Sequence, residues 1–239
     1  LPGGGLYEGE LKSGVPHGEG KITWESGEEY EGSFKNGDLY GYGKGLMTLE
    51  SGAKYQGELK GGVPYGKGIL TLKDGSWFKG NFKNGIPTGS GEGLLILGNG
   101  VEYRGELKNG LPEGEGSLIS PDGSKYEGTI RDRIPNGKGV LIKKNGDKYE
   151  GWFVDGKMQG SGILTWNNGD KYEGDFVDAL PGGRGKLEWA NGDVYKGTFK
   201  EGYPSGRGIK TLNKGDEYSG EFAYGVPDGE GTLEWENGN

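Results

Sequence analysis

Hydrophobic and polar positions in this chain alternate with a period of two that restarts at regular intervals. In the stretch YEGDF at 172–176, the two aromatic residues and the glycine fall on one side and the two carboxylates on the other. The stretch GRGKLEW at 183–189 repeats this alternation, with the charged residues separated from the glycines, leucine and tryptophan. Neighbouring side chains of a strand point to opposite faces, so each stretch predicts a β-strand.

The same frame returns along nearly the whole chain. It opens with an aromatic residue, has Gly two positions later, and has an apolar residue two positions beyond that. The opening residues are Tyr7, Tyr30, Tyr55, Phe78, Tyr103, Tyr126, Tyr149, Tyr172, Tyr195 and Tyr218. They are 23 residues apart, except for 25 after Tyr30 and after Phe78. A fixed period of this kind indicates a repeat architecture, so we expect one repeat domain over 1–239 with a lead-in at 1–6.

Two turn signals punctuate each unit. The first lies near pairs such as Asn36-Gly37 and Asn84-Gly85, and the second is a pair such as Asp74-Gly75 or Asn191-Gly192. These dipeptides tolerate the positive φ angles of tight hairpin turns. The predicted fold is therefore all-β, a single-layer elongated antiparallel meander of tandem β-hairpins. So many strands in one open sheet favour a twisted and curved one.

The recurring glycines predict how the aromatic rings pack. We expect the apolar residue at the fifth position, such as Phe176, to face the second glycine of the following Gly-x-Gly, so that a large ring covers a residue without a side chain. The two longer units have two extra residues each near their hairpin tips, at 38–42 and 86–90. An even insertion keeps every later side chain on its expected face.

The frame Tyr-Glu-Gly-x-Phe, followed by Asn-Gly-x-Pro-x-Gly-x-Gly and an apolar strand, resembles the MORN repeat. The resemblance covers residues 7–239 in ten copies. Arg133 and Ala179 depart from it by replacing the first-turn glycine, and Ser120, Lys143 and Lys210 stand at normally apolar positions. The resemblance implies protein–protein scaffolding, often at cytoskeletal or ciliary structures, together with an affinity for phospholipid. In several members the repeats adjoin a lipid-kinase domain, a methyltransferase domain or a C-terminal membrane anchor.

Composition narrows the classes of function. The formal net charge is −8, which disfavours nucleic acid and acidic membranes as general partners. The absence of cysteine fits a reducing compartment and excludes disulfides, and no cofactor is predicted. The resemblance predicts a cytoplasmic protein associated with the cytoskeleton or a cilium. The chain begins with Leu1, and we expect it to be a fragment of a longer protein.

Catalytic and phosphate-binding motifs are weak. The single histidine, His17, stands at a position where other units carry Tyr65, Thr88 or Glu113, which predicts a solvated residue at a hairpin tip rather than a catalytic one. The stretch GGVPYGKG at 61–68 is close to a phosphate-binding loop but lacks the hydroxyl that holds magnesium and a following helix. We therefore predict that the chain is not an enzyme.

The sixth unit is basic. Between 125 and 148 there are seven cationic and three anionic residues, a net charge of +4 within a chain of −8. One interpretation is a solvated stretch with a weakened core. The other is a docking site for an acidic peptide or a phosphoinositide headgroup, formed by Arg131, Arg133, Lys143 and Lys144.

The aromatic residues suggest a second binding surface. Most are expected to form the core, but a single-layer sheet can cover its apolar face only by curving. Some rings are therefore expected to stay accessible in a groove, and the candidates are Tyr172, Tyr195, Trp166, Trp189 and Trp235. Trp152 stands at a position where other units carry polar residues, so it is either a partner anchor or a lone surface aromatic.

Three functional hypotheses remain at this stage. The first is a non-enzymatic scaffold that binds a helix or an extended segment of a partner protein on a concave aromatic face, and that forms homodimers through an open sheet end. The second is a module that binds acidic phospholipid through the sixth unit. The third is the regulatory repeat region of a larger enzyme.

Overall fold

A computed structural model of the chain describes residues 4–238, so residues 1–3 of the predicted lead-in lie outside the described residues. Residues 4–238 form twenty β-strands. In chain order these are β1 (Leu6–Lys12), β2 (Val15–Thr23), β3 (Glu29–Lys35), β4 (Asp38–Thr48), β5 (Lys54–Lys60), β6 (Val63–Thr71), β7 (Trp77–Lys83), β8 (Ile86–Ile96), β9 (Glu102–Lys108), β10 (Leu111–Ile119), β11 (Lys125–Arg131), β12 (Ile134–Ile142), β13 (Lys148–Val154), β14 (Lys157–Thr165), β15 (Lys171–Val177), β16 (Leu180–Glu188), β17 (Val194–Lys200), β18 (Tyr203–Thr211), β19 (Glu217–Ala223) and β20 (Val226–Glu234).

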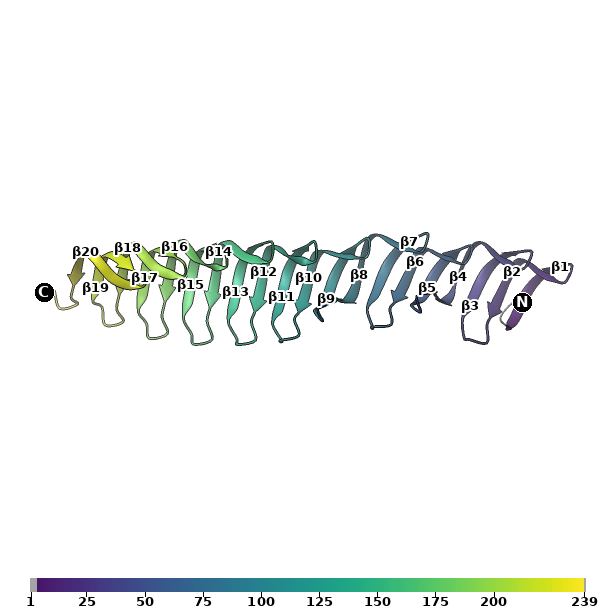
Figure 1. The fold of residues 1–239 in the computed structure, drawn as a ribbon, viewed down its shortest axis with the longest axis horizontal. Coiled ribbons are helices and arrows are strands. Elements are labelled where there is room, and N and C mark those ends of the chain that lie inside the picture. The colour runs from purple at the N-terminus through teal and green to yellow at the C-terminus, as the bar shows by residue number, and fades with distance from the viewer. Residues whose placement is uncertain (1–3, 239) are drawn as a thin grey trace. The chain divides into compact units, whose positions relative to one another are not determined.

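The chain divides into two compact units, each of which contains several repeats. The first unit ends at Gly116 and the second unit begins at Ser117. Within each unit, every strand pairs antiparallel with the next one along the chain (Figure 1). The predicted all-β meander of hairpins is thus confirmed.

The first turn of each hairpin is tight. Between β15 and β16, Asp178 and Ala179 have φ angles of 49° and 69°, the left-handed geometry that matches the twist of a hairpin. Arg133 has the same positive φ of 69° in the hairpin β11–β12. Arg133 and Ala179, which replace the first-turn glycine, therefore preserve the turn. They do so with a positive φ that is unfavourable for residues with a side chain.

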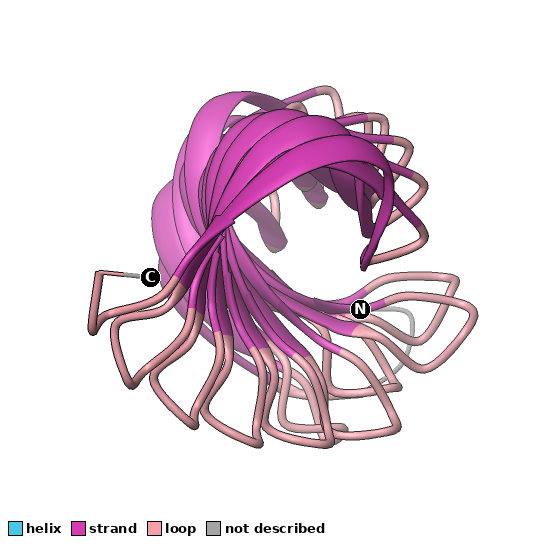
Figure 2. Cartoon of the chain, turned by 90° about the vertical axis from the view of Figure 1, so that its left-hand side faces the viewer, coloured by secondary structure: helices cyan, strands magenta, loops and turns pink. Residues whose placement is uncertain are grey.

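The aromatic face of each unit forms its core. Tyr172 is completely buried and makes edge-to-face contacts with two phenylalanines, Phe176 of its own hairpin at 5.2 Å and Phe199 of the next at 4.7 Å between ring centroids. Such edge-to-face pairs are favourable beyond the area that they bury. Figure 2 shows the strands bending strongly along their length. Side chains thus pack against one another within a single layer.

The glycines do face rings, but the predicted register is wrong. Phe176 lies opposite Pro181 in its own hairpin and opposite Gly160 of the preceding strand. The ring over the glycines is Tyr172, whose hydroxyl oxygen would lie 2.6 Å from a Cβ placed on Gly174. In this hairpin the register shifts between Gly174 and Phe176, where two residues of β15 span four of β16, and this β-bulge sets Phe176 opposite Pro181 instead of a glycine.

The loops between hairpins are joined by a ladder of hydrogen bonds. The backbone N–H of Asn167 donates to Oδ1 of Asp147 at 3.0 Å, and that of Asn213 donates to Oδ1 of Asp193 at 3.0 Å. Lys210, at a normally apolar position, places its amine 4.8 Å from the ring centroid of Trp189 and 3.8 Å from Oδ2 of Asp193. The positive charge of Lys210 therefore has an ion-pair partner and an aromatic partner, at a position where an apolar residue was expected.

The two insertions lengthen strands and leave the turns unchanged. β4 and β8 have 11 residues each, whereas β2 and β6 have 9. Tyr55 and Tyr103, which follow the insertions, are fully buried like Tyr30 before them. The expectation that an even insertion preserves the facing of later residues is confirmed.

Candidate functional site

A line of paired glycines crosses the strands of the second unit. Each glycine lies directly opposite the next, from Gly128 on β11 to Gly231 on β20. On one side of the sheet the tyrosine rings cover these glycines. On the other side no side chain projects from the line, which leaves a track of bare backbone.

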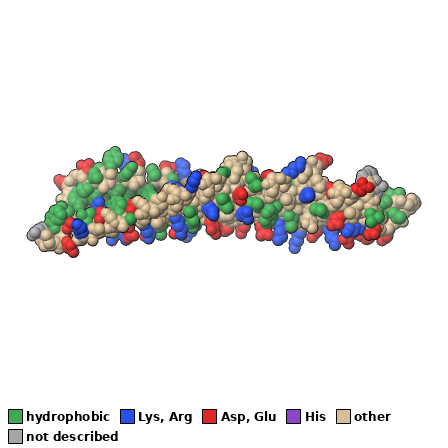
Figure 3. All heavy atoms as spheres, turned by 90° about the horizontal axis from the view of Figure 1, so that it is seen from below, with side chains coloured by type: hydrophobic (Ala, Val, Ile, Leu, Met, Phe, Trp, Pro, Cys, Tyr) green, Lys and Arg blue, Asp and Glu red, His purple; other side chains and the backbone are tan. Residues whose placement is uncertain are grey.

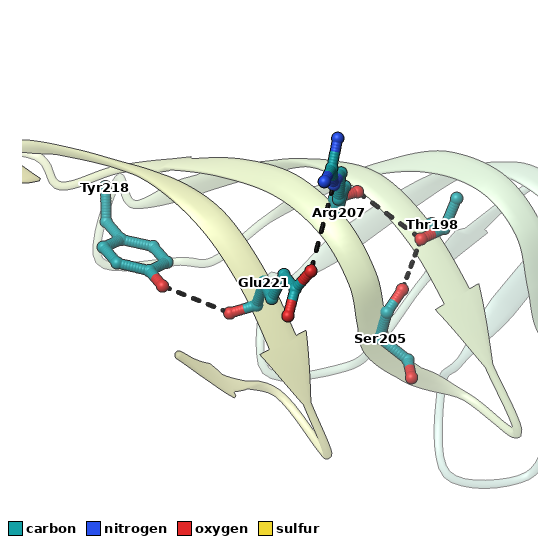
Figure 4. A network of polar contacts seen from close by, with 5 residues as sticks. All are labelled: Thr198, Ser205, Arg207, Tyr218 and Glu221. Carbon is teal, nitrogen blue, oxygen red and sulfur yellow. Dashed lines mark hydrogen bonds and ion pairs between the residues drawn. The ribbon is translucent and has the colours of Figure 1, made fainter. Parts of the chain in front are cut away.

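A groove of about 990 Å³ follows this track over β12–β16. Its floor contains the paired glycines, and its two sides are formed by the residues before and after each glycine, such as Glu173 and Asp175 on β15 or Lys186 and Arg184 on β16. These side chains alternate with the buried ones, so the groove lies on the face opposite the aromatic core. Figure 4 shows the same alternation further along, with the Arg207 side chain directed away from the side of the sheet that holds Tyr218.

Trp152 is the aromatic residue of this groove. It lies on β13, lines the groove and is 45% exposed. Lys138 lies directly opposite on β12 and places its amine 5.3 Å from the ring centroid, in cation–π distance. Val140 and Ile163 also line the groove, so an apolar patch interrupts the polar face over β12–β14.

Two carboxylates that line the groove are paired with lysines of the same strand. Lys148 lies 2.8 Å from Glu150 on β13, and Lys171 lies 4.0 Å from Glu173 on β15. On β16, the hydrogen bond and positive charge of Lys186 lower the pKa of Glu188. The anionic residues along the groove are therefore partly neutralised within the protein.

The first unit carries a groove of different chemistry. It has a volume of about 850 Å³, and no aromatic residue is among those that line it. Its glycine line is displaced by two residues at β8, where Gly91 pairs with Gly80 on one side and Gly93 pairs with Gly105 on the other. The insertion in β8 thus interrupts a track that is continuous in the second unit.

The repeat frame matches one family model throughout the chain. The MORN repeat is found at residues 7–29, 30–44, 55–77, 78–92, 103–125, 126–148, 149–171, 172–194, 195–217 and 218–239. The chain belongs to the MORN-repeat family. The resemblance seen in the sequence is thereby confirmed, with repeats that begin at the predicted residues.

Solved structures similar to this MORN-repeat protein share little sequence with it. The TCP10 domain of CPAP from Danio rerio, in complex with a peptide of STIL, has 13% identity and a TM-score of 0.43 over 90% of this chain and 94% of that one. The TCP domain of SAS-4 (dCPAP) from Drosophila melanogaster, in complex with a proline-rich motif of Ana2 (dSTIL), has 12% identity and a TM-score of 0.34 over 81% and 90%.

The MORN repeats do not form the predicted aromatic groove. Tyr172 and Tyr195 are 0% exposed, so the prediction that they stay accessible to a partner is wrong. Their rings are covered because the phenylalanine of the next hairpin packs against each of them. The groove of the second unit lies on the polar face rather than on the aromatic face where the sequence predicts one.

The four candidate tryptophans occupy two kinds of position. Trp166, Trp189 and Trp235 each follow the last residue of a strand, at the loops between hairpins, and none lines the groove. Trp166 and Trp189 are half-buried, whereas Trp235 is 48% exposed. Trp152 alone of the six predicted aromatic candidates lines the groove.

The basic residues of the sixth repeat are not brought together. Arg131 and Arg133 lie at the tight turn of hairpin β11–β12, and Lys143 and Lys144 lie at its other end. The nine residues of β12 separate the two pairs by roughly 25–30 Å along the strand. The prediction of one docking site that contains all four is wrong, because the repeat places its turns at opposite edges of the sheet.

Val140, Ile163, Arg184 and Lys186 line the groove, and sequence reasoning did not single them out. Their signal is present in the sequence as residues next to the repeated glycines. It becomes visible only when the polar positions of successive repeats are compared with one another.

Metal sites, a catalytic histidine and membrane-spanning helices find little support in residues 4–238. Within them, no group of three or more His, Asp or Glu side chains is arranged to hold a metal ion. His17 lies in strand β2 and is half-buried, not at a hairpin tip as predicted. No helix long and apolar enough to span a membrane is found in this part of the chain.

Proposed function

We propose that this MORN-repeat protein is a non-enzymatic scaffold that binds a segment of a partner protein in the groove of its second unit, with Trp152 as the anchor. One observation carries the proposal: a large aromatic side chain, 45% exposed, lines a groove on the otherwise polar face. Tryptophan is enriched among the residues that dominate binding energy at protein interfaces. A partner side chain that covers this ring would remove its apolar surface from water.

Exposed apolar residues continue from Trp152 toward the hairpin tips. Val154 lies two residues beyond Trp152 on β13. In the next hairpin, Val177 on β15 pairs with Leu180 on β16. All three are about half exposed. Figure 3 shows apolar side chains gathered toward the C-terminal end of one face, among intermixed acidic and basic ones. Val154, Val177 and Leu180 thus offer further apolar contact to a segment held at Trp152.

The dimensions of the groove favour an extended segment over a helix. Its two sides arise from residues two apart on each strand, which are separated by about 6.6 Å. An α-helix with its side chains is about 10–12 Å wide, whereas an extended chain needs about 5 Å. An extended segment can therefore reach the glycine floor between the two rows.

The sequence also predicts other functions for this chain. Binding of acidic phospholipid through the sixth repeat stays a prediction, and its four basic residues lie at opposite ends of a hairpin rather than in one cluster. A homodimer through an open sheet end, a cytoskeletal or ciliary location and membership of a larger enzyme stay predictions.

A tiled peptide library displayed on phage tests the proposal. We expect the chain to select peptides whose binding is weakened at least about tenfold by Trp152→Ala, since loss of a central aromatic anchor costs 2 kcal/mol or more. Trp235→Ala is the matched control, because Trp235 is similarly exposed but lies outside the groove. Selected peptides that bind Trp152→Ala as tightly as the original chain would overturn the proposal.

A further inference from the structure

Four cationic residues gather on the groove face of β16–β18. Arg184 and Lys186 line the groove itself. Lys196 lies directly opposite Lys186, and Arg207 holds the position next to the glycine that Arg184 holds one repeat earlier. We call Arg184, Lys186, Lys196 and Arg207 the cationic cluster. It stands out in a chain whose formal net charge is −8.

The anions near this cluster leave it incompletely paired. Lys186 forms an ion pair with Glu188, and Arg207 lies 4.0 Å from Glu221 with 90% of its side chain exposed. Among the described residues, Arg184 and Lys196 have no carboxylate oxygen within 4.0 Å of their charged nitrogens. Two members of the cluster are therefore available to an incoming anion.

Lys196 faces a like charge in the free protein, while the negative charge of Glu188 acts on both lysines. It faces Lys186 across the ladder between β16 and β17. Like charges directly opposite one another destabilise a sheet. A carboxylate of a partner placed between the two amines would be attracted to both of them.

The cationic cluster lies along the same groove face as Trp152. Four strand spacings separate β13, which carries Trp152, from β17, which carries Lys196, and each is about 4.8 Å. The resulting span of about 19 Å corresponds to roughly six residues of extended chain. A single extended segment can thus reach both Trp152 and the cluster.

We propose that the partner segment in this groove carries a large apolar side chain and, roughly six residues away, a cluster of carboxylates. This inference rests on the proposed function and adds the chemistry of the partner to it. The apolar side chain covers Trp152, and the carboxylates contact the cationic cluster. The partner is thus an acidic peptide segment with one apolar anchor.

Synthetic peptides test this chemistry directly. One probe has a single Phe, a spacer of five Gly and Ser residues, and four Glu; the second has four Gln in place of the Glu, and both are made in both orders. Fluorescence anisotropy measures their affinity for the full chain. We expect the better Glu peptide to bind at least tenfold more tightly than its Gln counterpart. This advantage should shrink as salt screens the exposed charges.

Two variants identify the groups responsible. The triple variant Arg184→Gln, Lys196→Gln and Arg207→Gln should remove the advantage of the Glu peptide. The control Lys54→Gln, Lys73→Gln and Lys83→Gln changes the net charge equally outside this groove and should preserve it. Trp152→Ala should weaken both peptides by a similar factor.

The outcomes separate the two proposals. Equal binding of Glu and Gln peptides, both dependent on Trp152, would overturn the acidic partner and leave the scaffold function in place. Binding that is insensitive to Trp152→Ala would overturn the scaffold function, and the anchored acidic segment with it. An equal loss in both triple variants would assign the effect to net charge and overturn the role of the cluster.

Discussion

The hydroxyl of Tyr172 donates a hydrogen bond to the backbone carbonyl oxygen of Asp175 at 2.8 Å, three residues further along the same strand. Asp175 lies where the register of its hairpin shifts, between Gly174 and Phe176, and faces the extra residues of β16. The tyrosine thus supplies the partner that a regular ladder would otherwise provide. In the fourth repeat the opening residue is Phe78, and the hydroxyl of Thr88 donates to the corresponding carbonyl of Asn81 at 3.4 Å instead.

Removal of this hydroxyl should destabilise the second unit. We expect Tyr172→Phe to lower the free energy of unfolding by about 1–2 kcal/mol, because the carbonyl of Asp175 loses its donor while the ring stays in place. Urea unfolding followed by circular dichroism measures the change. Tyr224→Phe is the control, since Tyr224 is 81% exposed. Equal stability of the two variants would show that the bulge carbonyl does not need this bond.

The glycines under the rings should tolerate no side chain. A Cβ on Gly185 would collide with the ring of Tyr172, whereas one on Gly98 would meet nothing within 4 Å. We expect Gly185→Ala to cost about 3 kcal/mol, at the upper end of overpacking effects, and Gly98→Ala to change stability by less than about 0.5 kcal/mol. The same urea titration compares them. A small effect at Gly185 would mean that the ring can move aside.

Asp147 should be important for the junction between neighbouring hairpins. It is 8% exposed, and its carboxylate accepts hydrogen bonds from the backbone N–H of Asn167 at 3.0 Å and from Nδ2 of Asn145 at 2.9 Å. We expect Asp147→Ala to cost about 2 kcal/mol, because both donors lose their acceptor. Thermal unfolding checks this, with the exposed Asp228→Ala as control. If both variants melt at the same temperature, the ladder contributes little.

The buried tyrosines should make the fold sensitive to alkali. Burial raises the pKa of Tyr149 to about 12, and burial with the charge of Glu58 raises that of Tyr55 to about 12. In the unfolded chain these phenols ionise near pH 10. Their contribution to stability is therefore complete below about pH 10 and is lost as the pH rises from about 10 through about 12.

Urea midpoints measured at several pH values between 8 and 12 check this alkaline loss. The decline should be shallower in Tyr149→Phe, which has one raised phenol fewer. Tyrosinate absorbance should rise in two stages, with the second coinciding with unfolding. Ionisation of all tyrosines near pH 10 with an unchanged circular dichroism spectrum would contradict the expected shifts.

Replacing one of the two lysines that face each other, Lys186 and Lys196, should stabilise the free protein. We expect Lys196→Glu to raise the free energy of unfolding by about 0.5 kcal/mol, because an opposite-charge pair replaces two like charges across the ladder. Lys54→Glu is the control, since Lys54 faces Thr71 and Thr48. Urea unfolding at low salt measures both. A loss of stability in Lys196→Glu would show that repulsion between the new carboxylate and Glu188 outweighs its attraction to Lys186.

The repeat, its strands and the facing of their side chains follow from the local pattern of residues. Alternation at 172–176 and the paired turn signals are local features, and ten copies of one frame allow a single arrangement of hairpins. The departures at Arg133 and Ala179 did not mislead this interpretation, because a turn of fixed length in the middle of a strong frame keeps its geometry.

Which surface is free, and which residues meet on it, depends on packing and pairing between repeats. Two extra residues in β16 set Phe176 opposite Pro181, and the ring of Tyr172 covers the paired glycines. Packing between successive repeats buries the tyrosines, and the bare glycine track on the opposite face becomes the groove. Arg131 and Lys144 are close in the sequence but lie at opposite ends of a hairpin, whereas Trp152 and Arg184 are 32 positions apart and line one groove. Pairing between strands sets these distances, and a single repeat does not contain that information.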